Sequence, residues 1–107
     1  DQDRALAFYL EKLGFEKRID VPNGKGERWV EVAPPGSATT IALVRAREGN
    51  PTGIDTQVRF TTKDAKADHA ELRGRGVDAD GEVMRSPVPM FVFRDPDGNR
   101  FVTVERD

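Results

Sequence analysis

The chain of 107 residues contains no cysteine and only one histidine. The absence of cysteine excludes disulfides, thiolate metal sites and cysteine nucleophiles, and is typical of proteins in a reducing compartment. No hydrophobic run approaches the length of a membrane span. The opening DQDRALAFYL lacks the basic segment and apolar core of a signal peptide. We therefore expect a cytoplasmic protein with no membrane partner.

Charge of one sign is also not in excess. The 17 Lys and Arg residues are scattered among 19 Asp and Glu residues, which gives a formal net charge of −2. Because no long basic run is present to neutralise phosphates, the sequence predicts no nucleic-acid partner. The length is typical of a single domain that buries a core of its own.

Several positions recur at one fixed offset along the chain. Six pairs of residues are separated by 62 positions: Leu10 and Leu72, Gly14 and Gly76, Trp29 and Phe91, Val30 and Val92, Pro34 and Pro96, and Gly36 and Gly98. An offset that keeps a helix stop, a strand and a turn in register indicates one supersecondary unit used twice. A doubled unit favours a pocket between its two copies.

The two copies predict matching elements. In the first, a helix capped by Asp1 or Asp3 runs to about Leu13, and strands follow near 16–21, 28–33 and 39–45. In the second, a strand at 56–61 precedes a helix from Asp64 to about Arg73, with strands near 81–85, 90–94 and 100–105. We divide the single domain into module one (1–44), a connection (45–53) and module two (54–107). Applied to the strand at 56–61, the offset places its counterpart before residue 1, so the sequence lacks the opening strand of module one.

Two stretches mark a family resemblance. DRALAFYLEKLGF (3–15) and FRDPDGN (93–99), together with RGVD after the second helix, resemble the vicinal oxygen chelate superfamily. This superfamily includes glyoxalase I, bleomycin-resistance proteins and extradiol dioxygenases, and the resemblance covers essentially the whole chain. It implies an α+β fold of two βαβββ modules whose mixed sheet curls into a cup. It also implies a homodimer, with cups at or near the dimer interface.

The resemblance locates the positions of a family metal site. Metal-using members place one ligand in each of four strands, and three of these positions correspond to Ala42, Gln57 and Val102, while the fourth lies in the missing strand. Stable sites use imidazole or carboxylate donors. Alanine and valine offer no lone pair, and glutamine is a weak neutral donor, so we expect no cofactor. If the alignment with the family were shifted by one residue, Glu31 and Glu105 would be the nearest carboxylates. The alternative to a protein without a cofactor is one that binds a divalent metal such as Zn, Ni, Mn or Fe.

No catalytic residue emerges from the remaining chemistry. His69 lies at helical spacing from Ala65 and Leu72, on the helix face that is expected to pack on the sheet, which predicts a structural role. One histidine in that place supports no Ser–His–Asp arrangement. The segment NGKGE lacks both the spacing and the ending of a phosphate-binding loop.

Strand alternation predicts which side chains line the cup. If Val58 and Phe60 pack under the second helix, Gln57 and Arg59 face the cup, as do Thr40, Ala42 and Val44 of module one. The candidate ligand-binding residues are Trp29, Glu31, Gln57, Arg59, Met90, Phe91, Phe93 and Val102. The match of Trp29 with Phe91 favours equivalent cup positions, with a purely core role as the equal alternative. Arg59 could pair with an acidic ligand or with Glu31.

Three functions are compatible with these residues, because this fold hosts all of them. The first is a metal-free small-molecule-binding protein that sequesters an aromatic drug or metabolite, as antibiotic-resistance members of the family do. The alternative is a divalent-metal-dependent lyase, isomerase or dioxygenase, similar to lactoylglutathione lyase (glyoxalase I), with the metal as a Lewis acid. The third is a protein whose cup is filled by its own side chains. Ala42 and Val102 argue against the metal-dependent enzyme, so we expect binding rather than catalysis.

Overall fold

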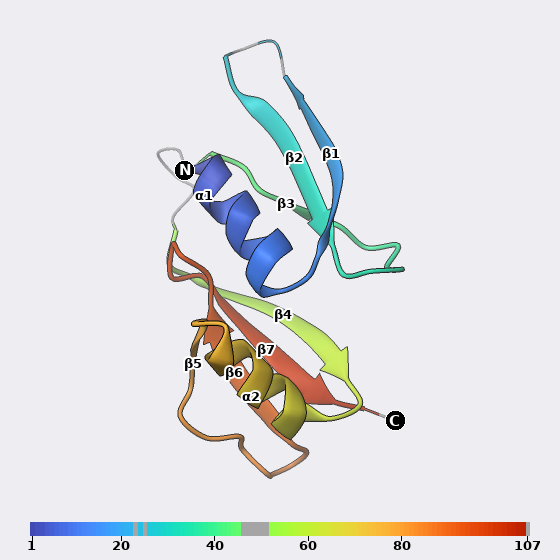
Figure 1. The fold of residues 1–107 in the computed structure, drawn as a ribbon, viewed down its shortest axis with the longest axis vertical. Coiled ribbons are helices and arrows are strands. Elements are labelled where there is room, and N and C mark those ends of the chain that lie inside the picture. The colour runs from blue at the N-terminus through green and yellow to red at the C-terminus, as the bar shows by residue number, and fades with distance from the viewer. Residues whose placement is uncertain (23, 25, 46–51, 107) are drawn as a thin grey trace. The chain divides into compact units, whose positions relative to one another are not determined.

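The computed structural model describes residues 1–22, 24, 26–45 and 52–106. The chain forms two compact units, Asp1–Pro51 and Thr52–Asp107, each with a helical segment and a sheet of its own (Figure 1). The predicted α+β class and the repeated helix-and-sheet module are confirmed. The unit boundary falls inside the predicted connection 45–53, of which residues 46–51 lie outside the described residues.

The first unit contains a helical segment followed by three antiparallel strands. Its elements are α1 (Gln2–Ala7), the π-helix η1 (Phe8–Lys12), β1 (Glu16–Pro22), β2 (Arg28–Ala33) and β3 (Ile41–Ala42), in the sheet order β1-β2-β3. The Asp1 carboxylate accepts a hydrogen bond from the Arg4 amide and caps α1. Gly14 follows the helical segment with a φ of 73°, a conformation that glycine adopts without the strain of a Cβ atom.

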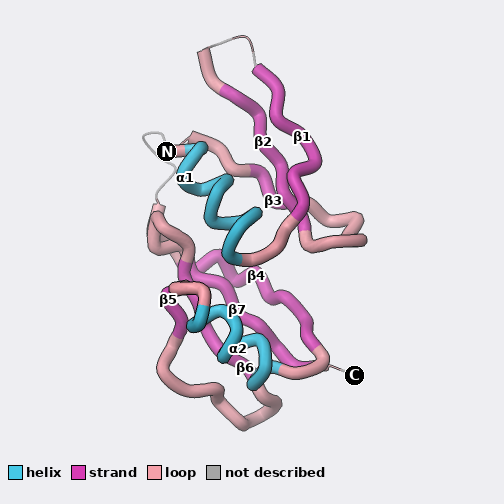
Figure 2. The backbone as a smooth tube through the Cα atoms, viewed as in Figure 1, coloured by secondary structure: helices cyan, strands magenta, loops and turns pink. Residues whose placement is uncertain are grey.

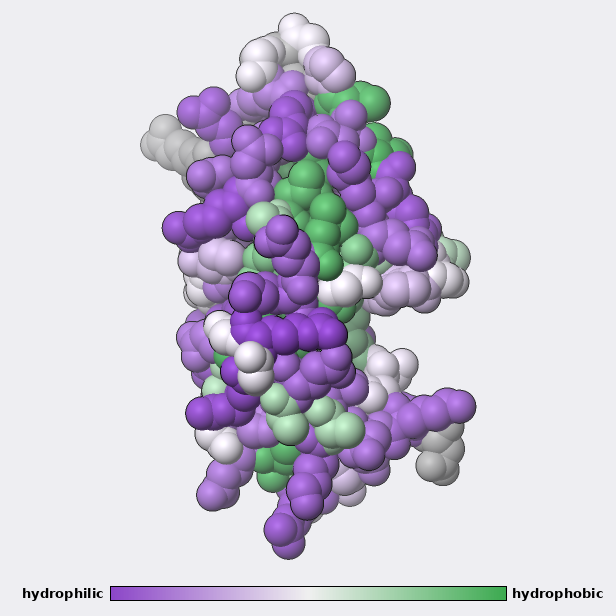
Figure 3. Space-filling view, in the orientation of Figure 1, coloured by the Kyte–Doolittle hydropathy of each residue, from purple (hydrophilic) through white to green (hydrophobic). Residues whose placement is uncertain are grey.

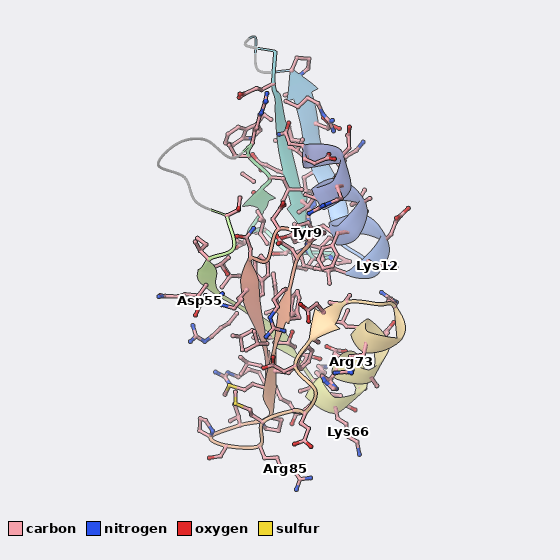
Figure 4. All side chains as sticks on the ribbon, turned by 90° about the vertical axis from the view of Figure 1, so that its left-hand side faces the viewer. Tyr9, Lys12, Asp55, Lys66, Arg73 and Arg85 are labelled. Atoms are coloured by element: carbon pink, nitrogen blue, oxygen red, sulfur yellow. The ribbon has the colours of Figure 1, made fainter. Side chains whose placement is uncertain are left out.

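The core of the first unit lies between the helical segment and one face of its sheet. Tyr9 is buried, as are Val30 and Val32 of β2. Figure 4 labels Tyr9 on the sheet side of this segment. Because side chains alternate along a strand, Trp29 and Glu31 of β2 point to the opposite face. In the described part of this unit, that opposite face carries no helix (Figure 2).

The second unit builds a mixed sheet around aromatic residues. Its elements are β4 (Asp55–Thr62), α2 (Ala65–Gly74), β5 (Asp78–Ala79), β6 (Met90–Arg94) and β7 (Arg100–Glu105). The order is β4-β7-β6-β5, with β4 parallel to β7 and the other neighbours antiparallel. Phe60, Phe93 and Phe101 pack with ring centroids 5.5–6.1 Å apart. Arg73 of α2, labelled in Figure 4, donates to the carbonyl oxygens of Ala79 and Asp80 and ties the helix to β5.

The two sheets repeat the same strand order. The strand order β1-β2-β3 of the first sheet corresponds to β5-β6-β7 of the second sheet, in which β4 is an additional strand beside β7. Within the described residues of the first unit, no strand takes the corresponding place beside β3.

The prediction of a strand at 81–85 was wrong. The structure forms β5 at Asp78–Ala79 instead, and Met84 makes only an isolated bridge with Met90. Pro87 and Pro89 precede β6 and have no amide hydrogen to donate, so they cannot extend a regular ladder toward Met84. The strand predicted at 39–45 is also shorter, at Ile41–Ala42, although the Leu43 amide still donates to the Val30 carbonyl oxygen at 2.8 Å.

Candidate ligand-binding face

The uncovered face of the first sheet gathers side chains from all three strands. Val21 pairs opposite Trp29, and both Ile19 and Ala42 pair opposite Glu31. Residues directly opposite each other in a ladder share a face of the sheet. We call this surface the Trp29 face, and define it by Ile19, Val21, Trp29, Glu31, Thr40 and Ala42.

The Trp29 face exposes large apolar groups. The exposed fractions of Ile19, Val21 and Trp29 are 39%, 50% and 42%, and Val44, two residues after Ala42, is 52% exposed. Single exposed apolar side chains are ordinary, but several on one face of a small sheet are typical of a binding surface. On the α1 side of the first unit, hydrophobic residues are flanked by many hydrophilic ones (Figure 3).

Glu31 is the one carboxylate of this face, and two neutral donors hold it. The Trp29 indole Nε1–H donates to Oε2 at 2.6 Å, and the Thr40 hydroxyl donates to Oε1 at 2.7 Å. The hydrogen bond from Trp29, followed by that from Thr40, lowers the pKa of Glu31 below its ordinary value because both favour the charged form. Glu31 is therefore ionised at neutral pH.

Three other carboxylates of the first unit have arginine partners. The Arg28 guanidinium binds Asp20 at 3.0 Å and Asp3 at 2.5 Å, and Arg18 binds Glu16 at 3.0 Å. Glu31 differs, because among the described residues its hydrogen-bond donors are an indole and a hydroxyl, neither of which carries charge. Its negative charge stands beside aliphatic and aromatic groups.

In the second unit, Arg59 of β4 lies on the sheet face that α2 does not cover. Phe60 contacts Phe93 and Phe101 on the α2 side, so the neighbouring Arg59 faces away from α2 and pairs opposite Val102 of β7. Its Nη1 donates to the Gln57 carbonyl oxygen at 3.1 Å. Met90, at the start of β6, is half-buried.

Gln57 was assigned to the cup because side chains alternate along a strand, but β4 is irregular at this residue. Its φ is 59°, and the β4–β7 register shifts between Asp55 and Arg59. The Gln57 amide donates to Asp55 Oδ1 at 2.9 Å in this irregular segment. A bulge changes the side-chain phase of a strand, so counting by twos from Val58 does not determine where Gln57 points.

Phe91 and Phe93 are core residues, and the expected equivalence of Trp29 and Phe91 was wrong. Phe91 is 0% exposed, lies 5.1 Å from the His69 ring of α2, and thus faces the helix, whereas Trp29 faces away from α1. The buried counterpart of Phe91 in β2 is Val30. A shift of one residue exchanges the two faces of a strand, so the offset in these strands is 61 rather than 62.

His69 takes the structural place that its spacing predicts. Its Nε2 donates to the Asp80 carbonyl oxygen at 2.6 Å, and its ring packs edge-on against Phe91. The imidazole therefore joins α2 to the segment after β5, on the helix side of the second sheet.

The residues at the family ligand positions do not fit a metal centre. Ala42 lies in β3 and Val102 in the corresponding strand β7. The neighbours of each residue along its strand face the helix and are more buried than the residue itself. Neither side chain has a donor atom, and the Gln57 amide is a weak ligand. Across the described residues, no three His, Cys, Asp or Glu side chains are grouped closely enough to hold a metal ion.

Sequence reasoning named Trp29 and Glu31 but missed two members of the face. Ile19 and Val21 belong to β1, whose EKRIDVP sequence does alternate apolar residues after Arg18. The signal that could have found them is this spacing of two, read together with the pairing of β1 against β2. The bond from Thr40 to Glu31 connects positions nine residues apart and has no sequence signal of its own.

These modules define the class of protein. The profile of the Glyoxalase/Bleomycin resistance protein/Dioxygenase superfamily matches residues 1–103. The chain belongs to this superfamily. None of the helices in the described residues is long and apolar enough to cross a membrane.

Individual relatives are similar along nearly all of the chain. The uncharacterized protein YetH of Bacillus subtilis (strain 168) is 32% identical over 107 residues, covering 98% of this chain and 89% of that protein. The crystal structure of TnmS3, an antibiotic binding protein from Streptomyces sp. CB03234, is 36% identical with a TM-score of 0.86, covering 100% of this chain and 88% of that one. A superfamily member from Sphaerobacter thermophilus DSM 20745 is 38% identical with a TM-score of 0.87, covering 99% and 89%.

Proposed function

We propose that this protein binds a small, partly aromatic organic molecule, and that the Trp29 face forms part of the binding site. The binding is stoichiometric and makes or breaks no bond. The observation that carries the proposal is the exposure of Ile19, Val21 and Trp29 together on one sheet face. Aromatic and aliphatic walls with a few placed polar groups are the usual composition of a small-molecule site.

The relatives support this choice over the other functions of the superfamily. TnmS3 is described as an antibiotic binding protein, and its similarity to this chain extends over the whole of the described fold. We therefore propose that the ligand belongs to the same broad class, an aromatic antibiotic or a related metabolite, and that binding confers resistance by sequestration.

We further propose that no metal ion takes part in binding. This rests on the donor set, since alanine, valine and glutamine stand where the family places its metal ligands. The test is metal analysis of the protein after expression with Ni, Mn, Fe and Zn available. We expect no stoichiometric metal after dialysis, and one tightly held ion per chain would contradict the proposal.

A thermal-shift screen of aromatic antibiotics and small organic acids tests the binding itself. We expect saturable stabilisation by at least one aromatic compound, because a ligand that binds only the folded state raises its apparent stability. Trp29→Ala should abolish most of that shift. Ile54→Ala is the matched control, since Ile54 is exposed to a similar extent, at 43%, and lies outside the Trp29 face. Equal loss in both variants, or no stabilising compound, would contradict the proposal.

The assembly is proposed on the family resemblance, and the location on the composition of the sequence, which contains no cysteine. We propose a cytoplasmic homodimer. Light scattering should give twice the chain mass of 11.9 kDa, and cell fractionation should recover the protein in the cytoplasm. A monomer, or recovery outside the cytoplasm, would contradict the corresponding part.

A further inference from the structure

The Trp29 face carries a negative charge, on Glu31, to which the described residues of its own unit supply no counter-ion. Glu31 accepts hydrogen bonds from Trp29 and Thr40, and no described cation of the first unit binds it. Across the ladder it faces Ile19 on one side and Ala42 on the other. An ionised carboxylate has about four lone-pair sites, so two donors leave room for a third partner.

A ligand that covers this face removes water from Glu31 and so makes the free energy of its charged form less favourable. In the uncovered state, water solvates the side of Glu31 that the two donors leave open. A neutral apolar ligand would displace this water and leave a desolvated negative charge, which is unfavourable without a partner. A positive group on the ligand would remove the penalty and would form a charge-assisted hydrogen bond.

We propose that the ligand of the Trp29 face is a small organic cation, in which a protonated amine or a guanidinium group is attached to an aromatic body. The cation binds Glu31, and the body lies against Trp29, Val21 and Ile19. This inference deepens the proposed binding function and rests on it.

The positions of Glu31 and Trp29 allow one ligand to contact both residues. The indole Nε1 lies 2.6 Å from Glu31 Oε2, so a cation bound at the carboxylate is next to an aromatic ring as well. A cation that binds Glu31 above the plane of the indole, within about 6 Å of the ring centroid, would gain a further attraction from the negative face of the ring. Val21 lies opposite Trp29 and Ile19 lies opposite Glu31, which extends the apolar surface from the charge along β1.

Three probes with one aromatic body separate charge from burial. Isothermal titration calorimetry would compare 2-naphthylmethylamine (cationic), 2-naphthylmethanol (neutral) and 2-naphthoate (anionic). We expect the amine to bind at least about tenfold more tightly than the alcohol, as a hydrogen bond to a charged group implies. We expect the carboxylate to bind most weakly.

Variants assign the preference to Glu31. Glu31→Gln keeps the size of the side chain and should remove the preference for the amine while leaving the alcohol within about twofold, as expected when only the charge is lost. Glu11→Gln, an exposed carboxylate on η1, makes the same change in net charge elsewhere in the unit and should keep the preference. Thermal unfolding of each variant shows whether it is folded.

Two outcomes would overturn the inference. Equal affinity for the amine and the alcohol would do so while leaving the proposed binding function intact. Binding of none of the three probes would also overturn it, and the antibiotic screen would then decide the proposed function separately.

Discussion

The indole N–H of Trp29 donates to Oε2 of Glu31 at 2.6 Å, between two residues on the same open face of β2. This bond fixes an aromatic ring and a negative charge side by side. Thr40 holds the other carboxylate oxygen from the neighbouring segment before β3. The three residues form a preorganised polar spot within an exposed apolar surface.

Replacing Trp29 by phenylalanine should raise the pKa of Glu31. The hydrogen bond from Trp29 is the largest cause of the lowered pKa, and that from Thr40 is the second. Trp29→Phe should therefore raise the pKa more than Thr40→Val does, as followed by NMR titration of the Glu31 carboxyl carbon. Because the folded pKa is the lower one, this group stabilises the fold above its unfolded pKa, and that contribution is lost as the pH falls through the folded value. An unchanged pKa in both variants would show that these bonds do not persist in solution.

Phe91 and Trp29 should respond very differently to truncation. Phe91 is 0% exposed beneath α2, so Phe91→Ala should lower the free energy of unfolding by about 3–5 kcal/mol through lost burial and a new cavity. Trp29→Ala removes an exposed side chain and should cost much less. Chemical denaturation measures both, and Phe91→Leu provides a milder variant if the alanine variant does not fold. Similar losses for the two alanine variants would contradict the assignment of opposite faces.

Asp95 should be required for the turn between β6 and β7. Its Oδ1 accepts from the amides of Asp97 and Asn99, and its Oδ2 accepts from Asn99 Nδ2. Asp95→Ala leaves these donors without their acceptor and should cost about 1–3 kcal/mol of unfolding free energy. Asp95→Asn keeps one acceptor oxygen for the two amides and should cost less. The reverse order in chemical denaturation would contradict this account of the turn.

Arg28 should control the acid stability of the first unit. Its hydrogen bond to Asp20 is the largest cause that lowers the pKa of that carboxyl group, and the two carboxylates beside it raise the pKa of Arg28 itself. The stabilisation from Asp20 is therefore present above its unfolded pKa and is lost as the pH falls through the lower folded pKa. Arg28→Gln should remove this pH dependence in thermal unfolding measured from neutral to acidic pH. Arg18→Gln, which breaks an exposed pair, should change it little; matching curves for the two variants would contradict the prediction.

Much of the fold could be predicted because local signals agreed with the final structure. Asp64 caps α2, Gly76 ends its turn with a φ of 84°, and the alternation of MFVFR gives β6. The prediction of a strand at 81–85 was wrong because it took no account of the prolines before β6. A helix or strand can be predicted well from local sequence when residues within or next to it determine where it begins and ends.

The candidate site was less predictable because it depends on pairing between strands. Trp29 and Phe91 looked equivalent at the offset that fits both helix stops, yet one residue of difference in the hairpin places them on opposite faces. Gln57 lies at a bulge, where alternation fails. Ile19 joins Trp29 only through the register of β1 against β2, which no short stretch of sequence encodes.

Trp29 is the only tryptophan of the chain, so its fluorescence tests ligand binding at the Trp29 face most directly. Each compound that stabilises the protein in the thermal-shift screen would be titrated while Trp29 emission is recorded. The account predicts a saturable change in emission with the same dissociation constant as calorimetry gives. Stabilising compounds that bind with full stoichiometry but leave the emission of Trp29 unchanged would show that the ligand binds elsewhere, and would contradict the central claim.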